Sequence, residues 1–157
     1  MVQGKRTIAV ILLLFITVQV SASFSWRFRT VERTIAWVAQ HIEYVRETGD
    51  RWQSPVETLR RGKGDCEDFV ILCMAIIEEY NHGHSVLMCI GHNGNNRHAW
   101  LSVDDIQFEC TIGCRIEAGN YELERTLTLD QIKQRRMTNQ QDWIVWPIWK
   151  ILNPWAY

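Results

Sequence analysis

Residues 62–65 (Gly-Lys-Gly-Asp) constrain the fold of this chain more than any other segment, because they lead directly into a long apolar helical pattern. The two glycines allow a tight approach of the backbone, and Asp65 is a favourable N-cap residue. Over residues 66–81 the apolar side chains recur at steps of three and four, which predicts a helix with one face in the core. That face consists of Phe69, Cys73, Ile76, Ile77 and Tyr80. The rest of the chain has to cover this helix, and Cys66 lies in its first turn.

Three further segments have helical patterns. Apolar side chains at helical spacing predict an amphipathic helix over residues 29–46. Residues 54–57 (Ser-Pro-Val-Glu) form a capping box with proline at the first helical position, which predicts a short helix to about Arg61. A second capping box, residues 128–131 (Thr-Leu-Asp-Gln), predicts a helix to about Met137.

The predicted strands follow the central helix. Strands are expected over residues 85–91, 98–103 and 106–111, with a loop over residues 92–96 and a two-residue hairpin turn at Asp104 and Asp105. The tail, residues 143–157, is expected to include one more strand, whereas residues 112–126 have no clear pattern. Helices followed by an antiparallel sheet, without a repeat or a linker, predict a single α+β domain over residues 23–157.

The first 22 residues have the order of a secretory signal peptide. Lys5 and Arg6 precede an apolar run over residues 8–18, and residues 20–22 (Val-Ser-Ala) place small side chains where a signal peptidase cleaves. The run is shorter than the roughly 20 residues of a membrane span. A cleaved signal peptide over residues 1–22 is the first interpretation, and an uncleaved N-terminal membrane anchor is the alternative. Both interpretations predict an exported domain, either periplasmic or secreted.

Charge and cysteine content narrow the function. The chain of 157 residues has 17 Lys plus Arg and 18 Asp plus Glu, for a net charge of −1. This balance argues against a protein that binds nucleic acid through a basic surface. The five cysteines are an odd number, and an odd cysteine in an exported protein suggests a free, reactive thiol.

Cys66 has the environment that a reactive thiol needs. Unpaired backbone N–H groups and the positive end of the helix dipole stabilise a thiolate at a helix N-terminus. The same N–H groups could receive a developing oxyanion. The alternative is that Cys66 is simply a small residue packed in the first turn.

The predicted hairpin brings a histidine and a carboxylate together. With Asp104 and Asp105 as the turn, the two strands have an apolar face and a polar face. The apolar face holds Ala99, Leu101, Val103, Ile106, Phe108 and Cys110, and the polar face holds His98, Trp100, Ser102, Gln107, Glu109 and Thr111. His98 and Glu109 are diagonal neighbours on the polar face, within reach of a hydrogen bond. The turn aspartates lie roughly 20 Å from His98 along the strand and are expected to be solvated.

A thiol, an imidazole that takes its proton and a carboxylate that orients the imidazole form a nucleophilic triad. Residues 62–69 (Gly-Lys-Gly-Asp-Cys-Glu-Asp-Phe), followed by His98-Ala99-Trp100, resemble the transglutaminase-like superfamily. Residues 52–59 (Trp-Gln-Ser-Pro-Val-Glu-Thr-Leu) are similar to the bacterial transglutaminase-like cysteine peptidases. The resemblance spans residues 52–111.

This resemblance implies a papain-like fold, with the nucleophile on a helix N-terminus and its partners on adjacent antiparallel strands. It assigns Cys66 as the nucleophile, His98 as the general base and acid, and Glu109 as the orienting carboxylate. The family generally has Asp at the third position, so Glu109 departs from the pattern. The expected activity is that of a cysteine hydrolase, a peptidase or amidase that requires no cofactor and cleaves peptide or isopeptide bonds of a protein or peptide substrate.

The resemblance also suggests residues that support the reaction. Trp52 or Gln53 could supply an oxyanion donor. Periplasmic members of the family bind calcium through acidic residues that flank the cysteine, and Asp65 and Glu67 match those positions. Calcium takes six to eight oxygen ligands, so these two residues do not define a site, and an N-cap with a first-turn acid is the favoured interpretation.

The other cysteines and the tail leave several alternatives open. Cys73 and Cys110 are expected to be buried, Cys89 to lie in a strand and Cys114 to lie near the surface. Two disulfides are open in three pairings, or none, and closeness in sequence favours Cys110 with Cys114. A zinc site is disfavoured because its candidate ligands lack Cys-x-x-Cys spacing; these are His82, His84, Cys89, His92, Cys110 and Cys114. The tryptophans of the tail are expected to pack on the sheet, and a binding or membrane-surface element is the alternative.

Two other functions remain open. The same site is an acyltransferase, able to cross-link proteins, if an amine outcompetes water for the acyl enzyme. A non-catalytic protein-binding module on the same fold is the second alternative, and the departure at Glu109 is the argument for it. The sequence predicts neither the oligomeric state nor the identity of the substrate.

Overall fold

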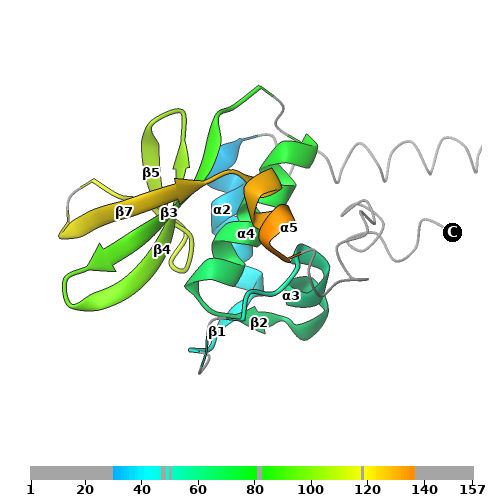
Figure 1. Cartoon of the computed structure of the whole chain (residues 1–157). Coiled ribbons are helices and arrows are strands. Elements are labelled where there is room, and N and C mark those ends of the chain that lie inside the picture. Colours follow the sequence, from blue (N-terminus) through cyan, green and yellow to red (C-terminus); the bar gives the residue numbers. More distant parts are fainter. Residues whose placement is uncertain (1–29, 47–48, 50, 81–82, 118, 137–157) are drawn as a thin grey trace, which may run out of the picture.

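The computed structural model describes residues 30–46, 49, 51–80, 83–117 and 119–136 (Figure 1). The predicted signal peptide and the tryptophan-rich tail lie outside the described residues, and those predictions stay open. Within the described part, no helix has the length and apolar character needed to cross a membrane.

The first described helix is shorter than predicted. Helix α2 (Val31–His41) begins at Thr30, whose side chain accepts a hydrogen bond from the Arg33 N–H at 3.2 Å. The prediction of a helix to residue 46 is wrong at its end, because the chain continues into strand β1 (Glu43–Tyr44), which pairs in parallel with β2 (Lys63–Gly64). The N–H groups of residues 43 and 45 donate to the carbonyl oxygens of residues 62 and 64, both at 2.8 Å. This pairing fixes the chain directly before Cys66.

Both predicted N-caps are confirmed, and at Thr128 both hydrogen bonds of the capping box form. Ser54 accepts a hydrogen bond from the Glu57 N–H at 3.1 Å and begins helix α3 (Pro55–Arg61). Gly62 ends α3 in the left-handed conformation, with φ 63°. Helix α5 (Leu129–Arg136) begins at Thr128, where Gln131 and Thr128 exchange hydrogen bonds of 2.9 and 3.2 Å.

Helix α4 (Cys66–Tyr80) forms the centre of the core. The predicted stripe is buried at Phe69, Cys73, Ile76 and Ile77. Burial extends beyond that stripe, since Val70, Ile71, Leu72 and Met74 are buried as well. Helices α2 and α3 and strands β3 and β4 pack around α4, so a one-faced pattern underestimated how completely it is enclosed.

A five-stranded sheet lies against the helices, in the order β6-β5-β4-β3-β7 (Figure 1). Its strands are β3 (Val86–Asn93), β4 (Asn96–Val103), β5 (Ile106–Glu109), β6 (Cys114–Arg115) and β7 (Tyr121–Leu127). The predicted loop over residues 92–96 is a tight turn at residues 94–95, and β6 and β7 were not predicted. All described strand pairs in this sheet are antiparallel.

The predicted hairpin register is confirmed. Asp104 and Asp105 both have positive φ, 47° and 66°, as a tight two-residue turn requires. Val103 pairs with Ile106, and Leu101 pairs with Phe108. The apolar face of the hairpin therefore turns toward α4, and the fold is the predicted α+β arrangement of a cysteine-bearing helix on an antiparallel sheet.

Candidate active site

The carboxylate of Asp68, which the sequence patterns did not identify, fixes the start of α4. Asp68 is fully buried and accepts hydrogen bonds from the backbone N–H groups of Gln53 at 2.6 Å and Asp65 at 3.2 Å. A Cβ at Gly64 would lie 2.6 Å from the Asp68 Cβ, so the glycine makes room for this carboxylate. The available signal was an acid at the third helical position, which commonly reaches back to the N-cap backbone. Asp68 thus links α4 to the chain before α3.

Cys66 lies at the first position of α4 with a side chain that is 7% exposed. Its thiol donates a hydrogen bond to Glu67 Oε2 at 2.8 Å. Burial raises the pKa of the Cys66 thiol, and the charge and hydrogen bond of Glu67 raise it further, while a backbone hydrogen bond from Ala99 lowers it. The net direction is opposite to that expected from the helix N-terminus alone, so formation of a thiolate at Cys66 needs a base that takes its proton.

His98 and Glu109 meet as the hairpin register predicts. His98 Nε2 lies 2.6 Å from Glu109 Oε2, and Glu109 is only 6% exposed. The other carboxylate oxygen accepts hydrogen bonds from the Thr111 N–H at 3.2 Å and the Thr111 hydroxyl at 2.8 Å. Burial alone would raise the pKa of Glu109, but the hydrogen bonds from His98 and Thr111 lower it below its ordinary value. The carboxylate is therefore ionised, and His98 Nε2 is the donor.

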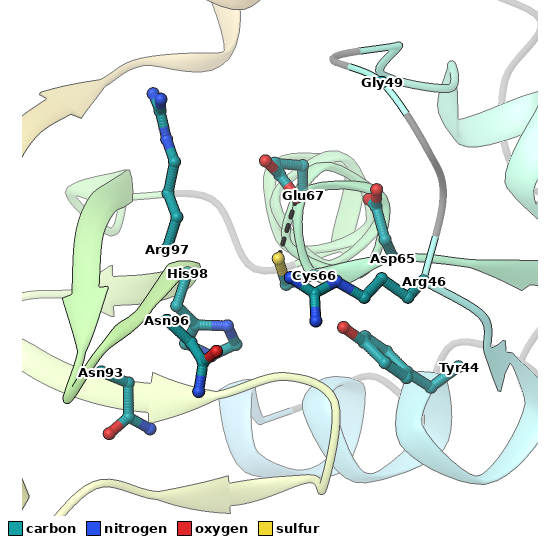
Figure 2. Close-up of a pocket in the computed structure, with 10 residues that line it drawn as sticks. All are labelled: Tyr44, Arg46, Gly49, Asp65, Cys66, Glu67, Asn93, Asn96, Arg97 and His98. Carbon is teal, nitrogen blue, oxygen red and sulfur yellow. Dashed lines mark hydrogen bonds between the residues drawn. The ribbon is translucent and has the colours of Figure 1, made fainter.

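Cys66 and His98 line one cleft of about 480 Å³ between the helix and the sheet (Figure 2). Cys66 comes from the helix side and His98 from the strand side. The remaining lining residues are Tyr44, Arg46, Gly49, Asp65, Glu67, Asn93, Asn96 and Arg97. Glu109 stands behind His98 and is not part of the lining. Of the three residues predicted as a triad, Cys66 and His98 thus line the same cleft, and Glu109 contacts His98 from outside the lining.

The two predicted supporting residues are buried. Trp52 belongs to the hydrophobic core, and the Gln53 backbone N–H is bound to Asp68. Neither is among the residues that line the cleft of Cys66. An oxyanion role for either one stays a prediction.

The acidic residues beside Cys66 do not form a complete metal site. Burial, followed by the charges of Glu67 and Asp68, raises the pKa of Asp65 to about 7. Asp65 Oδ1 is buried without a hydrogen-bond partner, while Glu67 accepts a hydrogen bond from the Cys66 thiol. Among the residues that the structure describes, no group of three or more His, Cys, Asp or Glu side chains is arranged to hold a metal ion. Asp65 and Glu67 alone do not complete a calcium site, and calcium binding stays a prediction.

All five cysteines are free thiols. Cys73, Cys89 and Cys110 are buried, and Cys114 is exposed, as expected from their positions in the sequence. Burial raises the pKa of the Cys110 thiol, and the neighbouring Cys73 raises it further. The favoured pairing of Cys110 with Cys114 is not present in the structure.

Comparison with known proteins identifies the family. A family described as a transglutaminase-like domain matches residues 18–108, which include Cys66 and His98 and end directly before Glu109. A solved structure of a candidate cysteine protease from Cytophaga hutchinsonii is similar at 16% identity and a TM-score of 0.43, covering 62% of this chain and 44% of that protein. No curated protein matches the chain significantly. Since the family match covers more than half of the sequence, the chain belongs to the transglutaminase-like domain family.

Proposed function

We propose that the chain is an exported cysteine hydrolase that cleaves amide bonds of a protein or peptide. Cys66 is the nucleophile, His98 the general base and acid, and Glu109 the carboxylate that orients His98. The observation that carries this proposal is the 2.6 Å contact between His98 and Glu109, made by a histidine that lines the same cleft as the Cys66 thiol. An imidazole–carboxylate pair that shares a cleft with a thiol is the set of groups that nucleophilic catalysis by cysteine requires.

The bond between His98 and Glu109 leaves one ring nitrogen of His98 for proton transfer. His98 Nε2 is occupied by Glu109, so Nδ1 is the nitrogen that receives the thiol proton. The Cys66 sulfur then bonds to the carbonyl carbon, and the carbonyl oxygen becomes an oxyanion. His98 returns the proton to the leaving amine as the C–N bond breaks. Water, deprotonated by His98, finally releases the acyl group and restores the thiol.

The contacts of Glu109 support its use in place of the usual aspartate. The longer side chain starts from the last residue of β5, and Thr111 binds one of its oxygens twice while His98 binds the other. Its lowered pKa keeps it charged, which is what stabilises an imidazolium. These contacts favour a catalytic site over a binding module that has kept only the fold.

The test is the rate at which iodoacetamide labels Cys66 near pH 6, followed by peptide mapping. We expect Cys66 to be labelled faster than the exposed Cys114, which serves as an internal reference. Removing the general base in His98→Ala should lower the labelling rate of Cys66 by at least about tenfold. His92→Ala is the matched control, because His92 also pairs with a glutamate, Glu124 at 3.2 Å, but on the exposed surface of β3.

Equal and slow labelling of every accessible cysteine, unaffected by His98→Ala, would refute the catalytic role. A protein with the expected labelling is then incubated with peptides in the presence and absence of a primary amine. Release of free acid identifies a hydrolase, and incorporation of the amine identifies the acyltransferase alternative. Export is tested separately, by the mass of the N-terminal peptide and the cell fraction that contains the protein.

A further inference from the structure

Tyr121 connects the far edge of the sheet to both triad members on the strands. It is the first residue of β7, which is separated from β5 by β3 and β4. Its ring nevertheless packs edge-on against Trp100, with centroids 5.1 Å apart, and lies 6.1 Å from the ring of His98. Its hydroxyl donates a hydrogen bond to Glu109 Oε2 at 3.0 Å. A single side chain thus contacts the imidazole and its carboxylate.

The backbone beside His98 explains how Tyr121 reaches so far. Gly91 pairs with His98 on β4 and with Leu123 on β7, and the ladder is irregular between residues 90 and 91. A Cβ at Gly91 would lie 1.9 Å from the Glu122 carbonyl oxygen. Only glycine permits this approach of the two backbones, which brings the start of β7 toward the strand of His98.

The Tyr121 hydroxyl completes the hydrogen bonding of the carboxylate. Oε2 of Glu109 accepts from His98 and Tyr121, and Oε1 accepts twice from Thr111. Burial, together with this bond to Glu109, raises the pKa of Tyr121 to about 12. The hydroxyl therefore keeps its proton at neutral pH and acts as a donor. Rotation of the carboxylate would break hydrogen bonds at both of its oxygens.

We propose that Tyr121 is a positioning residue of the triad, which fixes the Glu109 carboxylate with its hydroxyl and covers the His98–Glu109 pair with its ring. The inference rests on the proposed function, since it assigns a role in orienting His98. Loss of one donor destabilises the charged carboxylate, so it raises the pKa of Glu109. The titratable groups that face Glu109 are His98 on β4, Tyr121 on β7, Cys114 on β6 and Cys110 behind the strand.

The experiment compares Tyr121→Phe with the unmodified protein in the iodoacetamide rate at Cys66 from pH 4 to pH 8. We expect the rate at pH 6 to fall by about fivefold, because the Glu109 carboxylate loses one of its hydrogen-bond donors. The acid limb of the profile should move to higher pH, because Glu109 protonates earlier. A merely structural role would lower the melting temperature without moving this limb.

Tyr80→Phe is the matched control. Tyr80 also has a pKa raised to about 12 by burial, but it lies at the opposite end of α4 from Cys66. Its removal should leave the profile unchanged. If Tyr121→Phe is too unstable to assay, 3-fluorotyrosine at position 121 keeps the ring and strengthens the donor, so the acid limb should move to lower pH.

The outcomes separate this inference from the proposed function. An unchanged pH profile in Tyr121→Phe, or an unchanged acid limb with fluorotyrosine, overturns the role of Tyr121. If Cys66 is still labelled slowly in His98→Ala, the proposed hydrolase function stands. If His98→Ala labels at the rate of the unmodified protein, the hydrolase itself fails, whatever Tyr121 does.

Discussion

Asp68 holds the helix start that carries the nucleophile, and replacing it by asparagine measures how much that support contributes. The buried carboxylate accepts one backbone hydrogen bond at 2.6 Å from Gln53 and another at 3.2 Å from Asp65. Asparagine has nearly the same shape but only one acceptor oxygen. In Asp68→Asn, one of the two backbone N–H groups therefore faces an NH₂ group, which is itself a donor.

The magnitude follows from these two bonds. A hydrogen bond to a charged acceptor contributes about 1.5–3 kcal/mol, and a neutral one about 1 kcal/mol. Asp68→Asn loses one charged bond and reduces the other to a neutral bond. Relief of the repulsion between Asp68 and Asp65 offsets part of this loss, since Asp68 is one of the charges that raise the pKa of Asp65. We expect unfolding to become easier by about 2–4 kcal/mol.

Urea unfolding, followed by tryptophan fluorescence and circular dichroism, gives the free energy of unfolding. The matched control is Asp130→Asn, which removes an exposed carboxylate that is 3.3 Å from Lys133. That exposed pair should contribute less than about 1 kcal/mol. A free energy for Asp68→Asn within about 0.5 kcal/mol of the unmodified protein would show that the two buried bonds do not hold the helix start.

Three further predictions concern the cleft. The pKa of Glu109 is lowered in the folded state, so its ionised carboxylate stabilises the fold above pH 4.5, and this stabilisation is lost as the pH falls through the folded-state pKa. Urea titrations should therefore show that the difference in free energy of unfolding between the unmodified protein and Glu109→Gln shrinks from pH 6 to pH 3. A difference that stays constant with pH would contradict this. Arg97 lines the cleft, so Arg97→Gln should lower the ratio of iodoacetate to iodoacetamide rates at Cys66 by about twofold, with Arg125→Gln unchanged. Since no group of three or more His, Cys, Asp or Glu side chains among the described residues is arranged to hold a metal ion, EGTA should leave the labelling rate of Cys66 unchanged; a decrease that calcium reverses would establish a calcium site.

The local features of this fold could be predicted from sequence. The Asp104-Asp105 turn has positive φ at both residues, and it fixes the register that places His98 and Glu109 on one face. Ser54 accepts the predicted hydrogen bond from the Glu57 N–H, and Thr128 and Gln131 exchange both hydrogen bonds of a capping box. In each of these cases the partners lie within a few residues of each other or across one tight turn, so the pattern of side chains determines the geometry.

The remaining features depend on contacts between distant segments. Strand β7 is an edge strand with exposed side chains from Glu122 to Thr126, so it lacks the alternation of apolar and polar residues that marks a half-buried strand. Its first residue, Tyr121, therefore had no visible link to Glu109. The pairing of β1 with β2 ended a helical pattern that continued to Val45, because backbone bonds to Gly62 and Gly64 replaced helical ones. The periodicity of apolar residues does not show that these strand hydrogen bonds compete with the helical ones.

The state of the Cys66 thiol shows why a helix N-terminus alone does not make a thiolate. The helix dipole supplies roughly half a positive charge at that end. The carboxyl groups of Asp65, Glu67 and Asp68 lie at the same end. Glu67 Oε2 accepts a hydrogen bond from the Cys66 thiol, at 2.8 Å from the sulfur. Burial, followed by the charge and the hydrogen bond of Glu67, raises the pKa of the Cys66 thiol against the effect of the dipole. Activation of Cys66 therefore depends on His98, so the nucleophile is formed where the sheet meets the helix rather than by the helix itself.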